Sequence, residues 1–471
     1  MLWVAPLMLS ACGNPLDPAY SESQLQQWNA GKAARGHTFA GSPEWQVHMD
    51  FLETGLADAG ITDVIKLPTP HRRWWASDNP ALSERNLTID GEAIPVASYW
   101  AYSGATPEDG VTAPLVMYEK RMPAADMQGK IVVFQVKPVP DSLAKMFTIG
   151  NYYQTADFDS PRASIASDQW YQGNFVTRFG RFDRALRGSG AAGAIAVFAM
   201  SYDRLHGLYT FPLFEEDVVG VPGIYVDQQA GERVLAAAAA GSDATLTLLA
   251  DEEEVEPYFY SAVLPGKHHG TPQDREIMLV THSDGPNLTQ ENGGIAMLAM
   301  LRHFSRTPQS ARNKSIRILL DPQHFSPGRH TINWYDLHPD IMQRTDAVVG
   351  VEHIGQLEFG EDANGNYGLT GLPEPWQIFV RNDPQLIQIA IDAVEDTAVP
   401  RTELRVPEIK GQGSWTGLAE IAIKRDIPGY GTLSDMSGYW STQAGIDSFD
   451  AGLAKQQIDV LVKLIEGLQN R

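Results

Sequence analysis

Short apolar runs bounded by glycine predict buried strands in the middle of the chain. Such runs occur at 131–136, 194–198 and 221–226, and runs of this length suit strands that are covered on both faces. A helix over 228–240 and a strand over 245–249 follow them. We therefore expect a β-rich block from about 88 to 252.

The second half of the chain alternates apolar runs with helical patterns. Strands are predicted over 277–281, 316–320 and 347–351, and the stripe that contains Leu461, Leu464, Ile465 and Leu468 predicts a final helix. This alternation is typical of an α/β sheet with helices on both faces.

A helix is also predicted before the β-rich block. Ser42 can cap its first turn and Pro43 suits its first position. Its apolar face then recurs at helical spacing through Trp45, Met49, Leu52 and Leu56. After the β-rich block, the acidic run 251–254 indicates a solvated boundary.

Composition narrows the function classes. The chain has 471 residues, of which 43% are hydrophobic, so it can bury a large core. Its formal net charge of −22 repels phosphate backbones, so we expect no nucleic-acid partner and no basic membrane-surface patch. The single cysteine, Cys12, excludes an intrachain disulfide and a cysteine-based zinc site.

The first residues indicate export. Residues 1–11 are almost wholly apolar and end in small residues, as in the apolar region of a signal peptide. Leu9 to Cys12 resembles the bacterial lipobox, in which the cysteine is lipidated, and 12–25 has the composition of a tether. We expect an exported lipoprotein of the cell envelope that meets the membrane through its lipid alone. The alternative is a chance apolar start with an incidental cysteine.

The β-rich block resembles the protease-associated (PA) domain. The matching features are G-K-I-V-V-F from Gly129, G-A-A-G-A-I-A-V-F from Gly190, and V-P-G-I-Y-V from Val221 followed by a helix. The resemblance implies a domain without chemistry of its own that lies over or beside a protease site. The alternative is another small β-sandwich or barrel insert.

Polar residues follow each predicted strand of the second half. Ligands of α/β sheets bind outside the carboxyl ends of the strands, so these residues are the candidates for chemistry. Imidazole nitrogen and carboxylate oxygen are the donors that a catalytic zinc ion takes. The candidates are His282, Asp284, Glu291, Gln323, His324, Glu352 and His353.

From about 256 to 471 the chain resembles the co-catalytic zinc exopeptidases of peptidase clan MH. These include bacterial leucyl aminopeptidases, glutamate carboxypeptidase and glutaminyl cyclases. The resemblance rests on V-L-P-G at 263–266, a strand, His-x-Asp at 282–284 and an acid-Asn-x-Gly helix start at 291–294. It implies a mixed-sheet αβα sandwich of the phosphorylase/hydrolase-like type with an inserted PA domain.

The resemblance also implies domain boundaries. Residues 26–87 and 253–471 would form the zinc-exopeptidase-like domain, and 88–252 the insertion.

The resemblance assigns each site residue of the family to a position of this sequence. The first metal-binding histidine falls on His282, the aspartate that orients it on Asp284, and the bridging aspartate on Glu291. The pair of a general base and a metal ligand falls on Gln323 and His324.

Two departures follow farther along the chain. The next metal-binding aspartate falls on Glu352, and the last metal-binding histidine falls near Trp440, but no histidine follows His353. A neutral amide cannot take a proton from a zinc-bound water, so Gln323 is expected to orient water or substrate, or to have no catalytic role.

We therefore expect one zinc ion. Its ligands would be His282, Glu291 and Glu352. A second ion on Glu291 and His324, helped by His353 or Asp435, is doubtful.

Each candidate has an ordinary structural alternative. His282 and Asp284 could form a loop pair, Glu291 could favour a helix N-terminus, His324 could be a buried core histidine, and Glu352 could belong to a core ion pair. His268 and His269 are expected to be exposed in a turn. The run 72–75 could line a substrate mouth or end a surface helix, and the run 413–417 is not a serine-hydrolase elbow.

The favoured hypothesis is a divergent metallohydrolase that cleaves a peptide or amide bond of a small substrate with a metal-activated water. Proton transfer would then use Glu291, Glu352 or an imidazole. The second hypothesis is a binding module that keeps the exopeptidase fold without activity. A third is acyl transfer of the glutaminyl cyclase type.

Overall fold

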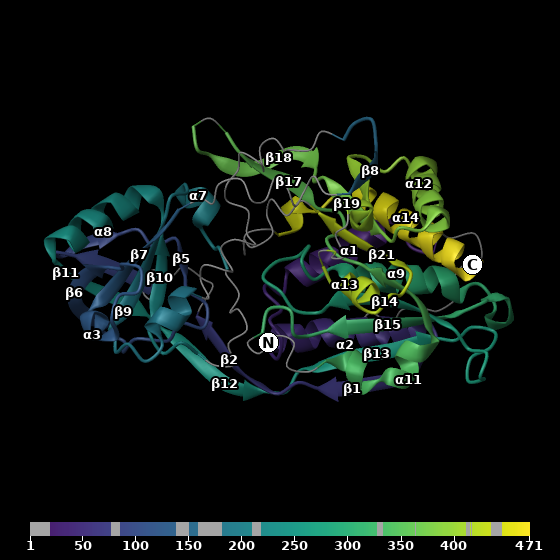
Figure 1. The fold of residues 1–471 in the computed structure, drawn as a ribbon, viewed down its shortest axis with the longest axis horizontal. Coiled ribbons are helices and arrows are strands. Elements are labelled where there is room, and N and C mark those ends of the chain that lie inside the picture. Colours follow the sequence, from purple (N-terminus) through teal and green to yellow (C-terminus); the bar gives the residue numbers. More distant parts are fainter. Residues whose placement is uncertain are drawn as a thin grey trace, which may run out of the picture.

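The computed structural model describes residues 19–76, 85–137, 150–158, 181–209, 218–326, 333–362, 364–410, 415, 417–434 and 445–471. Two lobes, each built on its own sheet, lie side by side (Figure 1). An antiparallel pair of strands, β2 (His71–Ala76) and β12 (Ala250–Val255), runs between them. The chain therefore enters the smaller lobe and leaves it along this two-stranded ribbon, and in between it returns once to the larger lobe to form β8 (Asn151–Gln154), which pairs with β20 (Thr402–Arg405).

The larger lobe is built on a mixed sheet. Within the described residues, its nine strands lie in the order β1 (Thr62–Pro68), β13 (Tyr258–Leu264), β15 (Ser315–Asp321), β14 (Glu276–His282), β16 (Thr345–Gly350), β21 (Gly429–Ser434), β19 (Trp376–Val380), β20 (Thr402–Arg405) and β8 (Asn151–Gln154). The strands predicted over 277–281, 316–320 and 347–351 are confirmed as β14, β15 and β16. These strands and β21 run parallel, so their carboxyl ends meet at one edge.

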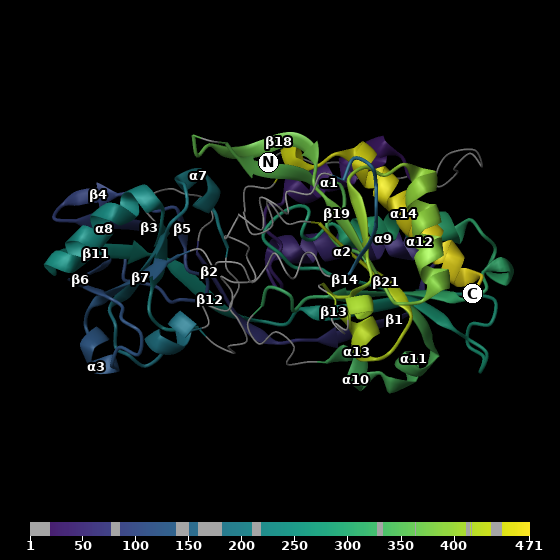
Figure 2. The same ribbon diagram turned by 45° about the horizontal axis from the view of Figure 1, so that its top comes forward.

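Helices cover both faces of this sheet (Figure 2). One face is packed by α1 (Glu22–Ala33), α2 (Pro43–Asp58), α9 (Gly293–Ser305), α12 (Pro384–Thr397) and α14 (Ala451–Gln469), and the other by α10 (Trp334–Leu337), α11 (Pro339–Arg344) and α13 (Glu420–Lys424). Along β14, Ile277 and Leu279 join the first core, whereas Met278 and Val280 join the second. The predicted αβα sandwich is confirmed, and none of the helices described here is long and apolar enough to cross a membrane.

Helix α2 forms for the reasons that its sequence suggests. The Ser42 hydroxyl accepts a hydrogen bond from the backbone N–H of Trp45 at 3.0 Å, and Pro43 opens the helix. The predicted apolar face is buried. The indole N–H of Trp45 also donates to Ser283 Oγ at 3.2 Å, which ties α2 to the segment directly after β14.

Helix α1 begins earlier than the sequence prediction allows. Residues 22–25, which were assigned to the tether, form its first turn, and Ser21 Oγ accepts from the N–H of Gln24. The predicted signal segment 1–11 and Cys12 lie outside the described residues. Helix α1 packs on α14 and α9 and thereby joins the core of the larger lobe.

The smaller lobe has a sheet of its own. Among the described residues its strands follow the order β4 (Glu92–Ile94), β3 (Arg85–Ile89), β11 (Asp243–Leu248), β6 (Val111–Met117), β7 (Ile131–Val136), β9 (Gly193–Phe198), β10 (Gly223–Val226) and β5 (Ser98–Tyr99). The helices whose full bounds the structure describes in this lobe include α3 (Ala124–Met127), α7 (Tyr202–Leu205) and α8 (Gln228–Ala240). The predicted strands and the helix over 228–240 are confirmed. The assignment of this lobe to the PA family stays a prediction.

The acidic run lies in the ribbon between the lobes. Residues 251–254 are exposed, as predicted, but they form strand β12 rather than a loop. Arg73 pairs with Glu253 at 2.7 Å and Arg72 with Glu254 at 3.3 Å. The run 72–75 lies on β2, so its interpretation as a helix end is wrong.

A hairpin of the larger lobe also contacts the smaller lobe. It consists of β17 (Leu357–Glu361) and β18 (Tyr367–Pro373) and extends toward α7 (Figure 1). Ser201 Oγ donates to Glu361 Oε1 at 2.5 Å, and Arg204 pairs with the same carboxylate.

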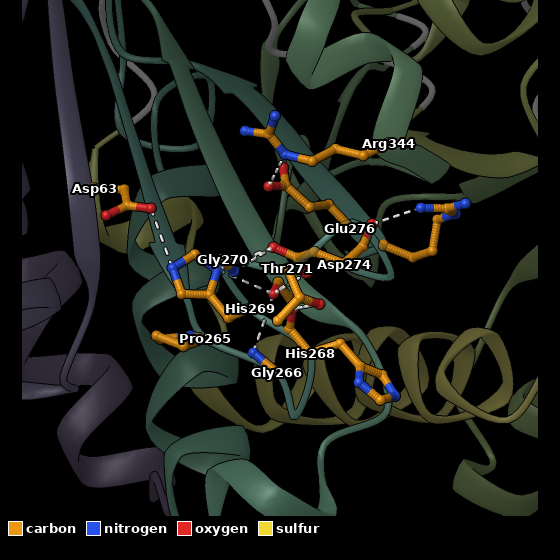
Figure 3. A network of polar contacts seen from close by, with 12 residues as sticks. Asp63, Pro265, Gly266, His268, His269, Gly270, Thr271, Asp274, Glu276 and Arg344 are labelled. Atoms are coloured by element: carbon orange, nitrogen blue, oxygen red, sulfur yellow. Dashed lines mark hydrogen bonds and ion pairs between the residues drawn. The ribbon is translucent and has the colours of Figure 1, made fainter.

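Charged side chains fasten the amino ends of the central strands. Glu276 is fully buried and pairs with Arg317 at 2.5 Å and with Arg344 at 2.7 Å. His269 lies between Asp63 and Asp274, 3.1 Å from each (Figure 3). The prediction of exposure is therefore right for His268 and wrong for His269, whose side chain is only 18% exposed.

We expect Glu276→Ala to destabilise the protein by about 3–5 kcal/mol, because it leaves the buried Arg317 guanidinium without its carboxylate. Glu420→Ala, which removes an exposed pair with Lys424, is the control and should cost less than about 1 kcal/mol. The measurement is the free energy of unfolding in urea. Equal effects of the two substitutions would contradict this role of Glu276.

Candidate metal centre

Parallel strands bring distant segments of the chain together at the carboxyl edge of the large sheet. His282 ends β14 and is paired in register with Asp321 at the end of β15. The backbone N–H of Ser283 donates to the Asp321 carbonyl at 2.7 Å, which keeps the two segments side by side beyond the sheet. Glu352 follows β16 by two residues on the other side of β14.

His282 and Glu352 face each other inside the protein. His282 Nε2 lies 3.9 Å from Glu352 Oε2, and their side chains are 0% and 2% exposed. The other carboxylate oxygen of Glu352 accepts from the N–H of Leu418 at 2.8 Å. The neighbouring Gly417 has φ +85°, and a Cβ there would lie 2.5 Å from Glu352 Oε1. Glycine is thus required beside this carboxylate.

His353 adds a third donor. One ligand atom each from His282, Glu352 and His353 lies within 4.8 Å of the other two, and all three residues are buried. The N–H of Ser434 donates to His353 Nδ1 at 3.3 Å, and the Gln290 amide lies 2.7 Å from Nε2. Burial, and the neighbouring His282 imidazole, hold the pKa of His353 well below its usual value, so the ring is neutral.

These three residues fit a divalent transition-metal ion. Two donors on a tetrahedral zinc ion lie about 3.4 Å apart, given metal–donor distances of about 2.0–2.1 Å. The separation of 3.9 Å between His282 and Glu352 is close to that value. Neutral imidazole and carboxylate are the forms that bind zinc.

Asp284 sets the tautomer of His282. The Nδ1 atom of His282 lies 2.7 Å from the backbone carbonyl of Asp284, so Nδ1 carries the proton and Nε2 offers its lone pair toward Glu352. This contact runs through the backbone, whereas the resemblance implied the Asp284 carboxylate. That carboxylate accepts from the N–H groups of His324 and Phe325 at 3.2 and 2.7 Å.

Burial raises the pKa of the Asp284 carboxyl well above its usual value, and the charges of Asp321 and Glu291 raise it further. Carboxylates are therefore crowded at this edge of the sheet.

Gln323 and His324, to which the resemblance assigns the general base and a metal ligand, lie beside the centre. The His324 ring stacks on the His282 ring with a centroid distance of 4.4 Å and an interplanar angle of 22°. The backbone N–H of Gln323 donates to Asp321 Oδ1 at 2.8 Å, and Gln323 is 8% exposed. His324 is thus adjacent to His282 but is not one of the three converging donors.

Glu291 has a cationic partner that the sequence analysis did not identify. Its carboxylate pairs with the ammonium of Lys32, and both side chains are 0% exposed. Burial raises the pKa of Glu291 to about 7, although the charge of Lys32 lowers it. The residue predicted to bridge metal ions is therefore held by a positive charge from the chain itself.

Helix α1 and the segment after it deliver this lysine. Lys32 stands in the last turn of α1, and its Nζ lies 3.4 Å from the carbonyl of Gly36. Thr38 then pairs through its backbone with Gly285, which follows His282 along the chain. His48 of α2 is also buried here, and burial together with the charges of Lys32 and Arg35 keeps its pKa well below the usual value.

Sequence reasoning missed Lys32 because 259 positions separate it from Glu291, as 291 − 32 gives. A lysine in the last turn of a helix is also the ordinary complement to the helix dipole. His353 was considered only as an auxiliary ligand of the doubtful second ion. Trp440 and Asp435 lie outside the described residues.

A cavity of about 950 Å³ lies between the lobes, and His282, Glu352 and His353 are not among its lining residues. Residues of the ribbon, of the segment 35–44 and of the smaller lobe line it, among them Arg35, His37, Arg73, Trp75 and Tyr209. His37 Nδ1 lies 2.7 Å from the Pro286 carbonyl, and Tyr209 donates to the Phe325 carbonyl at 3.3 Å. Two wall residues thus contact the segments that carry His282 and His324.

The fold is that of zinc aminopeptidases. A peptidase M28 precursor from Shewanella amazonensis SB2B is 15% identical, with a TM-score of 0.63 over 94% of each chain. BSAP, a zinc aminopeptidase from Bacillus subtilis, is 14% identical, with a TM-score of 0.59 over 94% of each chain. An aminopeptidase from Aneurinibacillus sp. strain AM-1 is 15% identical, with a TM-score of 0.58 over 94% of this chain and 93% of that one. The predicted zinc-exopeptidase-like fold is confirmed.

No protein-family model and no curated protein sequence matches the chain.

The start of α9 is the tightest packing position of the centre. A Cβ on Gly293 would lie 2.1 Å from Thr281 Oγ1 and 2.3 Å from the Val351 carbonyl. These atoms belong to the residues directly before His282 and Glu352. Only glycine lets the helix begin against both strand ends.

We expect Gly293→Ala to destabilise the protein by roughly 1–3 kcal/mol or more, since backbone must move to admit the methyl group. Gly31→Ala is the control, because a Cβ there meets nothing within 4 Å. It should be neutral or stabilising by about 0.5–1 kcal/mol. Thermal unfolding of both variants measures the difference, and an unchanged midpoint for Gly293→Ala would disprove the close approach.

Proposed function

We propose that this protein is a metal-dependent hydrolase that cleaves a peptide or amide bond. One observation carries the proposal: His282, Glu352 and His353 converge in a buried group at the carboxyl edge of the sheet. The fold of zinc aminopeptidases supports it. The ion is zinc in this proposal, and the chain holds one.

The charge balance of the centre supports a bound cation. Asp284, Glu291 and Glu352 are all buried, and buried carboxylates without a counter-charge are costly. Lys32 supplies a single positive charge, and it pairs with Glu291. A divalent ion between His282 and Glu352 would compensate the rest.

When bound, such an ion would polarise a substrate carbonyl and lower the pKa of a water molecule toward about 7. The side chain of Gln323 cannot accept a proton, so we assign it to orienting water or substrate through its amide. We assign proton transfer to the His324 imidazole, because an imidazole can accept and donate a proton near neutral pH and this ring lies next to His282, with the ring centroids 4.4 Å apart. Glu352 and Glu291 are held by Leu418 and Lys32 respectively.

The cavity between the lobes is the proposed substrate site. Its volume of about 950 Å³ is large enough for a short peptide, since the pockets that bind drug-sized ligands measure about 300–1,000 Å³. The smaller lobe contributes wall residues such as Tyr99 and Tyr209. We propose that this lobe is a PA domain that borders the site. We also propose, from the motif that ends at Cys12, that the protein is exported and lipid-anchored.

A second candidate is a binding module without hydrolytic activity. Two observations favour it: Lys32 neutralises Glu291, and an amide stands at Gln323 where the resemblance places the general base. Such a protein would bind peptides in the cavity and release them unchanged.

The metal content of the purified protein separates these candidates. We expect about one zinc ion per chain. We expect His282→Ala to lose it, because alanine has no side-chain atom that could replace the Nε2 ligand. His268→Ala, which removes an exposed histidine, is the matched control and should retain the ion. Elemental analysis after dialysis gives the count.

Absence of metal from a zinc-replete preparation would contradict the hydrolase proposal. Full metal content in His282→Ala would contradict the site. Stoichiometric metal without cleavage of any aminoacyl or peptidyl amide would favour the binding module.

Gln323→Glu tests the missing base. The substitution places a carboxylate where the resemblance puts the proton acceptor, and a positioned base contributes about 10²–10⁴-fold in rate. We expect kcat to rise with unchanged metal content. Gln309→Glu, at an exposed position far from the edge, is the control. A fall in kcat with intact folding would show that the amide is the group the reaction requires.

A further inference from the structure

We propose that the ammonium of Lys32 occupies the position of a second metal ion and thereby limits the centre to one ion. This inference rests on the proposed function, because it concerns the same centre. The juxtaposition that carries it is the buried pair of Lys32 and Glu291.

The pair is not a surface contact. Both side chains are fully buried, and ionised groups are taken out of water in this way only when they are matched by opposite charge. Glu291 stands at the start of the segment that opens α9, two residues before Gly293. A Cβ on Gly285 would lie 2.8 Å from Glu291 Oε1, so the chain after His282 packs directly against this carboxylate.

Glu291 therefore belongs to the centre by position, although Lys32 is its partner. Gly285, three residues after His282, packs against the Glu291 carboxylate and pairs through its backbone with Thr38. The resemblance assigns the bridging acid of a two-ion centre to Glu291, so a second divalent ion would need this carboxylate. Lys32 already contacts the carboxylate that such an ion would need.

The backbone holds Lys32 in place. The lysine lies in the last turn of α1, a helix anchored on α14 and α9. Its ammonium also lies 3.4 Å from the Gly36 carbonyl, and the strand pairing of Thr38 with Gly285 fixes the following segment. The ammonium is thus a permanent part of the centre, whereas a metal ion would exchange with solvent.

An ammonium differs from a divalent ion in what it supplies. It carries one positive charge and three hydrogen-bond donors, and it has no empty orbital with which to polarise a carbonyl. Lys32 can therefore hold Glu291 in place and balance its charge, but it cannot activate water as a second ion would. It acts as a positioning residue.

Lys32→Met tests the proposal, because methionine has a similar length and no charge. We expect the number of bound Zn²⁺ or Co²⁺ ions to rise from about one to about two per chain once Glu291 is released. Elemental analysis and titration with each metal give the count. We also expect added Zn²⁺ to raise the unfolding midpoint of Lys32→Met more than that of the wild type, because each bound ion stabilises the folded state.

Lys314→Met is the matched control. Lys314 is also largely buried and paired, with Asp346 at 3.1 Å, but it precedes the amino end of β15, at the opposite edge of the sheet. The metal content of Lys314→Met should equal that of the wild type. The double variant Lys32→Met/Glu291→Gln removes both charges and covers a failure of the single variant to fold, and it should return to about one ion per chain.

The outcomes separate this inference from the proposed function. A folded Lys32→Met protein with the metal content of the wild type overturns the role of Lys32, whatever the wild type binds. Unfolded Lys32→Met together with a folded double variant that binds two ions overturns it as well. A wild type without metal overturns the proposed function, and a gain of one ion in Lys32→Met would then still support the role of Lys32.

Discussion

Burial of carboxylates at one edge of the large sheet is the constraint on which the centre depends. Asp284, Glu291 and Glu352 are all removed from water there, and each must be matched by hydrogen-bond donors or positive charge. Each of the three carboxylates has a different set of partners. Asp284 accepts hydrogen bonds from two backbone N–H groups, and Glu291 pairs with Lys32. One carboxylate oxygen of Glu352 accepts from the N–H of Leu418, and the other faces His282 Nε2.

The two edges of the sheet are used in contrasting ways. At the amino ends of the strands, Glu276 is surrounded by the guanidinium groups of Arg317 and Arg344, so the charges balance within the chain. At the carboxyl ends, among the described residues, Lys32 pairs with Glu291, whereas Asp284 and Glu352 accept backbone N–H groups. The first edge is complete and structural, and the second is suited to a cation from outside.

The sequence predicted the elements well where a local pattern governs them. The strands β14, β15 and β16 and the cap of α2 at Ser42 follow from hydrophobic spacing and from capping. The parallel order of the strands then places His282 and Glu352 at one edge, because polar residues that follow parallel strands share that edge.

What the sequence could not predict depends on contacts between distant segments. The partner of Glu291 is a lysine on an N-terminal helix, and its position follows from the packing of α1 on α14 and α9 rather than from any motif. The left-handed backbone of His353, with φ of 57°, turns its ring into the centre. A pattern of side chains also cannot predict that the backbone carbonyl of Asp284 contacts His282 Nδ1.

The central claim is that one divalent ion binds between His282 and Glu352 while Lys32 holds Glu291. A crystal structure of the zinc-loaded protein, with anomalous scattering recorded at the zinc edge, tests it most directly. The account predicts one peak, at about 2.0–2.2 Å from His282 Nε2 and a Glu352 oxygen, with the Lys32 ammonium against Glu291. A second peak on Glu291 with Lys32 displaced, or no peak at this edge of the sheet, would contradict it.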